Sequence, residues 1–104
     1  YKHFGKDNVA KPKSPVSAAL DGTVIVTGWT METGFVIEIQ HSNNIVSVYK
    51  HNSSLLKETG DLVRAGEPIS IIGDSGEMLT SGPHLHFEIW YKGSPLDPEK
   101  HILF

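Results

Sequence analysis

Two histidines, His84 and His86, stand two residues apart in the run His-Leu-His-Phe-Glu-Ile-Trp-Tyr over residues 84–91. Apolar residues alternate with the others along this run, which is typical of a β-strand with one buried face. Residues two apart on a strand point to the same side, with Cα atoms about 6.6–7 Å apart. The two imidazoles can therefore converge on one small object such as a metal ion, although two histidines on a solvated sheet face would give the same pattern.

A second pair of metal-binding side chains, His3 and Asp7, flanks Gly5 near the start of the sequence. Zinc accepts imidazole and carboxylate ligands, and the glycine allows a loop to fold both toward one centre. A solvated chain end is the alternative interpretation of this pair alone. Together with the later histidines, the pair supplies three protein ligands and an open fourth position, the arrangement of a catalytic zinc. The sequence has no cysteine, so any metal site must use histidine and carboxylate.

Proton transfer at such a site needs a further group, because the sequence contains no His-Glu-x-x-His motif. A spare histidine is the obvious candidate, since a neutral imidazole can take a proton from water and an imidazolium can stabilise an oxyanion. His51 follows Tyr49 and Lys50 at the end of an alternating run. Alternation predicts that His51 ends a strand and shares the face of Tyr49. An exposed strand end is the other interpretation of this histidine.

The elements that must position these residues are predicted to be strands. Ten glycines and six prolines separate short β-branched runs, which indicates an all-β fold of antiparallel strands joined by turns. Residues 35–40 and 45–51 flank an Asn43-Asn44 pair and predict a β-hairpin. Residues 23–27 and 68–72 predict two more strands. One helical turn could follow a serine cap at Ser53 to Glu58, but Gly60 comes too soon for a stable helix, and no other segment favours a helix.

Length and composition narrow the classes of function. A chain of 104 residues predicts a single domain, here residues 1–104. The net charge is −3, from 9 basic and 12 acidic residues without a basic cluster, which argues against nucleic-acid binding. No apolar run approaches the length of about 18–20 residues that spans a bilayer, so no membrane insertion by this segment is expected.

Four motifs, which together extend over nearly the whole chain, resemble those of the lysostaphin-like (LytM-type) zinc metallopeptidases, a family of peptidoglycan endopeptidases. They occur in the order that this family has. They are His3-Phe4-Gly5-Lys6-Asp7, Pro15-Val16 followed by Asp21-Gly22, Tyr49-Lys50-His51, and Gly82-Pro83-His84-Leu85-His86-Phe87-Glu88.

The resemblance implies a zinc ion bound by His3, Asp7 and His86, with His51 and His84 as catalytic histidines. Spacing alone does not distinguish ligand from catalyst within the pair of residues 84 and 86, and the resemblance leaves open which catalytic histidine carries the proton. The implied fold is an antiparallel sheet or sandwich with a long groove, built as a duplicated hybrid motif with little or no helix. The implied chemistry is zinc-dependent hydrolysis of peptide bonds in peptidoglycan stem or cross-bridge peptides.

The resemblance also implies an extracytoplasmic location, in the periplasm, the cell envelope or the medium. Family members have a strand and loops before the first ligand, which predicts that this domain is a fragment of a longer envelope protein. Other segments of that longer chain are then expected partners, besides peptidoglycan itself. A non-catalytic module that binds the wall or activates a cell-wall hydrolase is the main alternative. A plain β-sandwich interaction domain without zinc is a third.

The remaining candidates carry weaker expectations. Glu88 lies on the imidazole face of its strand and either orients a metal ligand or is a plain edge carboxylate. His41 and His101 are expected to be solvated surface residues. Trp29 and Trp90 are expected to pack at a sheet margin or to stack on substrate.

Overall fold

A computed structural model describes residues 5–9, 14–73 and 84–96 of the chain; for residues 5–9, His84 and Leu96 it describes the backbone alone. All the regular secondary structure in these residues is β-strand, which confirms the all-β prediction. The strands are β1 (Gly5–Val9), β2 (Pro15–Ser17), β3 (Gly22–Thr30), β4 (Gly34–Gln40), β5 (Ile45–Leu55), β6 (Leu62–Val63), β7 (Pro68–Ile72), β8 (His84–Tyr91) and β9 (Ser94–Leu96).

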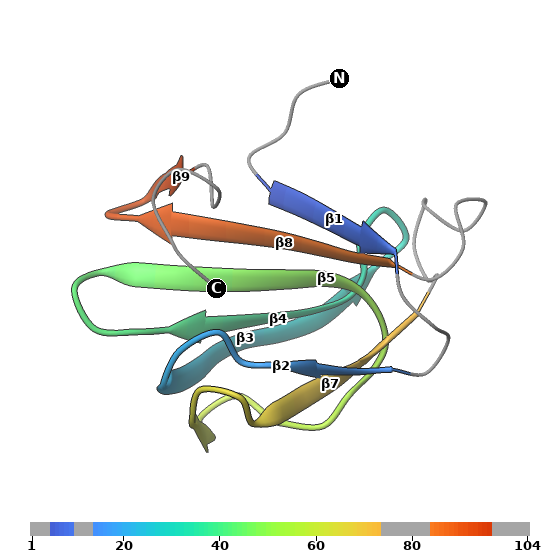
Figure 1. Cartoon of the computed structure of the whole chain (residues 1–104), viewed down its shortest axis with the longest axis horizontal. Coiled ribbons are helices and arrows are strands. Elements are labelled where there is room, and N and C mark those ends of the chain that lie inside the picture. Colours follow the sequence, from blue (N-terminus) through green and yellow to red (C-terminus); the bar gives the residue numbers. More distant parts are fainter. Residues whose placement is uncertain (1–4, 10–13, 74–83, 97–104) are drawn as a thin grey trace.

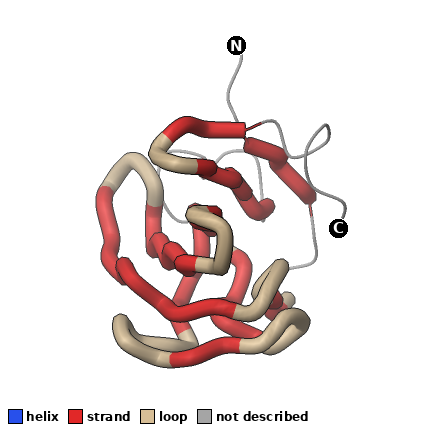
Figure 2. Tube along the Cα trace, turned by 90° about the vertical axis from the view of Figure 1, so that its left-hand side faces the viewer, coloured by secondary structure: helices blue, strands red, loops and turns tan. Residues whose placement is uncertain are grey.

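The strands form one antiparallel sheet in the order β1-β8-β5-β4-β3-β6. Strand β2 pairs with β7, β7 also pairs with β5, and β9 pairs with β8. Figure 1 shows β8, β5, β4 and β3 running side by side, with β2 and β7 below them. The strands follow a strong curl when viewed from the side (Figure 2). Strands β1 and β8, which are far apart in the sequence, pair with each other, and β1 forms one edge of the sheet.

The predicted hairpin is confirmed as β4 and β5. Asn43 and Asn44 have φ angles of 62° and 61°, the left-handed values that a tight hairpin turn requires and that asparagine tolerates. The helical turn considered for Ser53 to Glu58 does not form. Strand β5 continues to Leu55, because Ser54 and Leu55 pair with β7 and six residues are too few to nucleate a helix.

Strand β5 changes neighbours at His51. Residues 45–50 pair with β8, whereas residues 52–55 pair with β7. Against β4, Phe35 pairs with Asn52 and Ile37 pairs with Tyr49, so β5 carries one more residue than β4 between these pairs. This extra residue is a β-bulge, which breaks the two-residue alternation of side chains. His51 therefore lies inside a long strand at the point where the sheet divides, and the prediction that it ends a strand is wrong.

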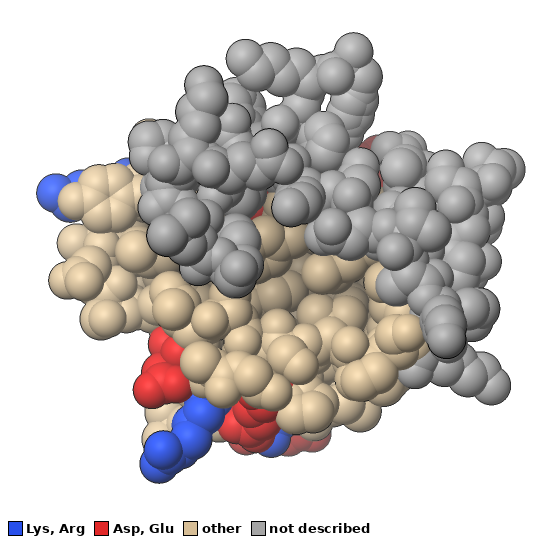
Figure 3. Space-filling view, viewed as in Figure 1, with Lys and Arg blue, Asp and Glu red and all other residues tan. Residues whose placement is uncertain are grey.

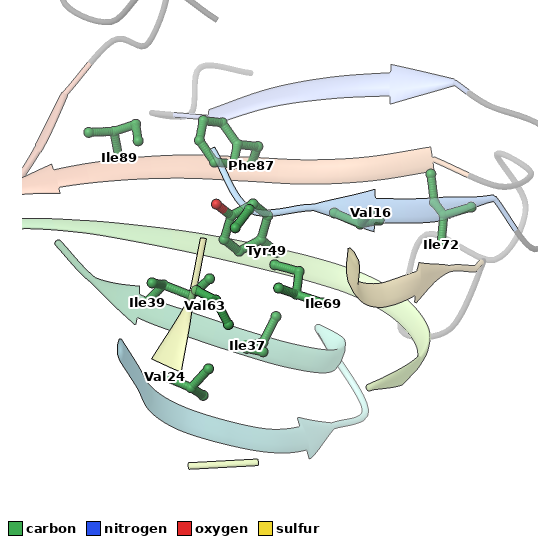
Figure 4. Packing of buried hydrophobic residues seen from close by; sticks show 11 residues of the cluster. Val16, Val24, Ile37, Ile39, Tyr49, Val63, Ile69, Ile72, Phe87 and Ile89 are labelled. Atoms are coloured by element: carbon green, nitrogen blue, oxygen red, sulfur yellow. The ribbon is translucent and has the colours of Figure 1, made fainter. Parts of the chain in front are cut away.

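The hydrophobic core lies between the sheet and the small β2–β7 ladder (Figure 4). Ile37, Ile39 and Ile89 are fully buried, and the Tyr49 ring lies 5.1 Å from that of Phe87. Burying one side chain of this kind contributes roughly 1.5–3 kcal/mol, and the alternation of β4 supplies two of them, at Ile37 and Ile39. The core thus anchors the inner faces of β4, β5 and β8, whose outer faces hold the candidate site.

His41 is buried, with 6% of its surface exposed, so its prediction as a solvated surface residue is wrong. Its Nδ1 lies 2.6 Å from the Asp21 carbonyl oxygen, and its Nε2 lies 2.6 Å from the Ser47 hydroxyl. Ser47 in turn donates to the Tyr49 hydroxyl at 2.9 Å. Gly22 makes the burial possible, because a β-carbon there would lie 2.8 Å from Nδ1 of His41. His101 lies outside the described residues.

The described surface carries mixed charge. On the face shown in Figure 3, acidic and basic side chains gather beside each other at the lower edge, near β6 and β7. Lys57 and Glu67 form one such ion pair. The described residues contain no helix that is long and apolar enough to cross a membrane.

Candidate functional site

Strand β8 presents the alternation that the sequence predicts. Phe87 and Ile89 belong to the core cluster, whereas His86 and Glu88 are joined to each other by a hydrogen bond on the other face. Both polar residues are buried, with 6% and 9% of their surfaces exposed. The β-strand thus carries an imidazole and a carboxylate on a mount that the core holds from behind.

Strand β1 brings one end of the chain to the other. The register pairs Asp7 with His86 and Val9 with His84. Residues paired in this way have Cβ atoms about 4.5–5.5 Å apart. The backbone of the predicted ligand Asp7 therefore lies opposite that of the predicted ligand His86, although nothing local in the sequence joins them. His3 and the side chains of residues 7 and 84 lie outside the described part of the chain.

His51 lies against His86. The two ring centroids are 6.1 Å apart, and the rings meet edge to face at 89°. Tyr49 contacts Phe87 on the core face, and residues 86 and 87 point to opposite faces of β8. His51 and Tyr49 therefore lie on opposite faces, so the alternation prediction is wrong here. The bulge in β5 adds the residue that turns His51 toward the predicted site.

Glu88 is the most heavily hydrogen-bonded carboxylate of the described residues. Its Oε2 accepts from His86 Nε2 at 2.7 Å and from Lys50 Nζ at 2.9 Å. Its Oε1 accepts from the Trp90 indole nitrogen at 2.9 Å. Burial acts to raise the pKa of Glu88, but the hydrogen bonds from His86, Lys50 and Trp90 outweigh it and lower the pKa to about 2. The carboxylate is consequently ionised at neutral pH and acts only as an acceptor.

This arrangement decides which nitrogen of His86 suits a metal. Because the ionised Glu88 only accepts, Nε2 of His86 carries the hydrogen, and Nδ1 is then the nitrogen with a lone pair in the neutral ring. A histidine whose second nitrogen donates to a carboxylate is the usual partner of zinc. The donor chemistry of His86 therefore fits a zinc site. No group of three metal-binding side chains occurs within the described residues, which exclude His3 and the side chains of Asp7 and His84.

A cleft of about 370 Å³ lies beside Glu88. Its lining combines a charged part with an apolar part on the outer face of β4, β5 and β8. The lining residues are Glu38, Val46, Val48, Lys50, Glu88, Trp90 and Gly93. Burial raises the pKa of Glu38, with Lys50 acting in the opposite direction.

The family model for peptidase family M23 matches residues 1–98. The chain belongs to this family. The fold is the lysostaphin-like one: the M23 domain superposes on the catalytic domain of lysostaphin from Staphylococcus simulans with a TM-score of 0.84 at 28% identity, over 94% of this chain and 77% of that chain. A zinc-containing peptidase from Vibrio cholerae gives a TM-score of 0.90 at 33% identity, over 98% of this chain and 31% of that chain.

Two curated relatives have names that indicate different functions. The DD-carboxypeptidase/endopeptidase Mpg of Neisseria meningitidis serogroup B is 35% identical over 92% of this chain and 22% of its own length. The murein hydrolase activator EnvC of Escherichia coli (strain K12) is 37% identical over 86% of this chain and 21% of its own length. The M23 domain therefore spans about a fifth of each of these relatives.

Sequence reasoning found Glu88 but missed its partner Lys50, as well as Asn52. Lys50 faces His86 across the β5–β8 ladder, and that pairing can only be known once the register is known. Asn52 directly follows the predicted catalytic histidine, and a polar residue inside a strand was the signal that could have identified it. Trp90 was expected at a sheet margin or on substrate; it is half-buried and donates to Glu88. Trp29 is 52% exposed on β3.

Proposed function

We propose that this domain is a zinc-dependent endopeptidase that hydrolyses peptide bonds in peptidoglycan stem or cross-bridge peptides. The observation that carries the proposal is the buried contact between His51 and His86, with Glu88 holding the second ring nitrogen of His86. Two buried imidazoles in contact, one of them fixed by a carboxylate, are typical of a catalytic or metal site rather than of a binding surface. Membership of a peptidase family supports the same conclusion.

In this proposal His3, Asp7 and His86 hold the zinc ion. The β1–β8 register supports this set because it places the backbones of residues 7 and 86 opposite each other. When bound, zinc supplies Lewis acidity that polarises a peptide carbonyl and makes water a better nucleophile near neutral pH. Glu88 keeps the hydrogen on Nε2 of His86, so that Nδ1 retains the lone pair that a metal requires.

His51 and His84 are the proposed catalytic histidines. One accepts the proton of the attacking water as a general base, and the other donates a hydrogen bond to the oxyanion that forms on the peptide carbonyl. His84 precedes His86 by two residues on β8 and pairs with Val9 of β1. His51 contacts the ring of His86 from β5. The cleft beside Glu88 is the proposed seat of a peptide side chain next to the bond that is cut.

The test combines a metal analysis with a digestion. The purified domain is expected to contain one zinc ion and to release peptide fragments from isolated peptidoglycan, and mass spectrometry of these fragments identifies the bond. His84→Ala and His51→Ala are expected to keep the zinc and to lose at least ~100-fold in rate, in the range found when a general acid-base group is removed. Stoichiometric zinc with undigested peptidoglycan would refute the proposal.

The second candidate function is that of a wall-binding module or an activator of a cell-wall hydrolase, which the similarity to EnvC favours. His84→Ala separates the two functions, because an activator keeps its effect on a partner hydrolase when this histidine is removed. For the endopeptidase the substrate is peptidoglycan, for a wall-binding module the ligand is peptidoglycan, and for an activator the partner is a cell-wall hydrolase. For each of these we propose an extracytoplasmic location. We also propose that residues 1–104 act as one domain of a longer envelope protein.

A further inference from the structure

Asn52 is a fully buried amide inside strand β5, directly after the proposed catalytic histidine. Its Nδ2 donates to the carbonyl oxygens of Phe35 and Tyr49, each at 3.0 Å. Its Oδ1 accepts from the hydroxyl of Ser70 at 2.8 Å, and Ser70 is fully buried as well. A buried amide with both donors and its acceptor engaged ties three strands, β4, β5 and β7, to one side chain.

The two carbonyl groups that Asn52 binds belong to the bulge. Phe35 pairs with Asn52 and Ile37 with Tyr49, so Phe35 and Tyr49 each begin the irregular stretch on their own strand. A bulge disrupts the ladder of backbone hydrogen bonds, and a buried carbonyl left without a donor is unfavourable. The side chain of Asn52 supplies a donor to each of these two carbonyls. The amide therefore reinforces the sheet at the place where β5 carries an extra residue against β4.

His51 occupies the bulge in a strained conformation. Its φ is 65°, in the left-handed region that non-glycine residues rarely adopt and that persists only when surrounding contacts enforce it. Its N–H donates to the Thr33 carbonyl at 2.8 Å, and its carbonyl accepts from the Gly73 N–H at 3.1 Å. Gly73 must lack a side chain here, because a β-carbon would lie 2.5 Å from that of Ser53. The backbone of His51 is thus fixed from two sides, and Asn52 fixes the next residue.

We infer that Asn52, held by Ser70, is a positioning residue that maintains the bulge and thereby aims the imidazole of His51 at His86. Without the bulge, alternation would turn the side chain of residue 51 to the core face beside Tyr49. This inference deepens the proposed function and rests on it, because it concerns the placement of a proposed catalytic histidine. The three hydrogen bonds of Asn52 described above lie within the scaffold, where they fix the backbone next to His51.

The decisive variant is Asn52→Asp, which keeps the shape and the acceptor for Ser70 but removes both donors. We expect kcat on a peptidoglycan peptide to fall by about 10–100-fold, because a displacement of about 1 Å of a catalytic group has an effect of this size. KM and zinc stoichiometry should stay unchanged, since none of the proposed zinc ligands belongs to β5. Ser70→Ala, which keeps both donors but loosens their orientation, should lower kcat less, by about 3–10-fold.

Ser47→Ala is the matched control. Ser47 is also a fully buried polar residue of β5, and it contacts His41 and Tyr49 on the core face, away from the bulge. It should lower the thermal unfolding temperature and leave kcat within twofold of the wild type. A decrease of kcat in Ser47→Ala equal to that in Asn52→Asp would overturn the inference, because general loosening would then explain both. So would an unchanged kcat in folded Asn52→Asp.

A readout without activity separates this inference from the proposed function. In nitrogen-15 NMR spectra of the histidine rings, Asn52→Asp should shift the His51 signals, with the His41 signals unchanged. If the wild-type domain hydrolyses nothing, the proposed function fails and the NMR result still decides the positioning role. If Asn52→Asp does not fold, Ser70→Ala decides by the same two readouts, and unchanged His51 signals and kcat in that variant overturn the inference.

Discussion

Replacing Glu88 by glutamine tests whether this carboxylate prepares His86 for a metal ion. The substitution keeps the shape of the side chain and removes its charge. Three groups donate to the carboxylate: His86 and Lys50 to Oε2, and Trp90 to Oε1. A glutamine has one acceptor atom and one donor atom at these positions, so it cannot satisfy all three donors in either orientation.

The two orientations of the introduced amide have different consequences. With its oxygen toward His86 and Lys50, the amide NH₂ faces the indole N–H of Trp90, and one hydrogen bond to a charged group is lost, worth about 1.5–3 kcal/mol. With its NH₂ toward His86, the amide faces the Lys50 ammonium, and Nε2 of His86 becomes an acceptor. The hydrogen then moves to Nδ1, the nitrogen proposed for the metal. The first orientation is therefore favoured, and His86 keeps its tautomer but loses the negative charge behind it.

We expect Glu88→Gln to bind zinc about 10–100-fold more weakly, as is typical when the carboxylate behind a metal-binding histidine is removed. This equals about 1.4–2.8 kcal/mol of binding free energy. Zinc affinity is measured by competition with a chelator of known affinity near neutral pH. Glu67→Gln is the matched control, because Glu67 also pairs with a lysine, Lys57, but near β6 and β7. Equal zinc affinities of wild type and Glu88→Gln would refute the role assigned to this carboxylate.

Three further predictions concern the core that carries the site. Tyr49→Phe leaves the Ala19 N–H and the Ser47 hydroxyl without their acceptor and should lower the free energy of unfolding by about 1–3 kcal/mol. Burial raises the pKa of Tyr49 in the folded state, so the Tyr49 hydroxyl contributes to the free energy of unfolding below about pH 10. This contribution is lost as the pH rises through the folded-state pKa. Urea unfolding at about pH 8 and pH 11 should therefore show a smaller loss of stability in Tyr49→Phe than in wild type. Gly22→Ala should lower the free energy of unfolding by ~1–3 kcal/mol or more in the same assay. The added β-carbon would clash with the carbonyl oxygen of residue 40 and lie 2.7 Å from Cγ2 of residue 39. A stability equal to that of wild type would contradict this close packing. Ile37→Ala should cost about 2–5 kcal/mol in calorimetric unfolding, since this side chain is fully buried, and a loss below about 1 kcal/mol would contradict its place in the core.

The elements that local patterns specify were predicted from the sequence. Strand β8 alternates strictly, so its core face and its imidazole face could be assigned from the order of its residues alone. Asn43 and Asn44 marked the turn of the β4–β5 hairpin, because few residues adopt two successive left-handed conformations. In each case the physical cause acts within a few residues of the chain, and the pattern therefore survives in the sequence.

The errors arose where distant contacts overrode local patterns. His41 follows a strand and precedes a polar turn, which is typical of an exposed residue, yet Ser47 and the backbone of Asp21 enclose it. The segment after Ser53 resembled a capped helical turn, but pairing with β7 continues strand β5 to Leu55. Neither partner can be recognised from the residues around the segment that it reorganises.

The sequence by itself determined the chemistry available to this M23 domain: a set of histidines and acids, no thiol, and strands to carry them. The tertiary structure alone decided how the described part of that set is brought together. The β1–β8 register sets Asp7 opposite His86 because two ends of the chain share one ladder. The bulge in β5 turns His51 from the core face to the site, because one added residue inverts the alternation of side chains. The packing of β4, β5 and β7 around Asn52 fixes the position of that added residue.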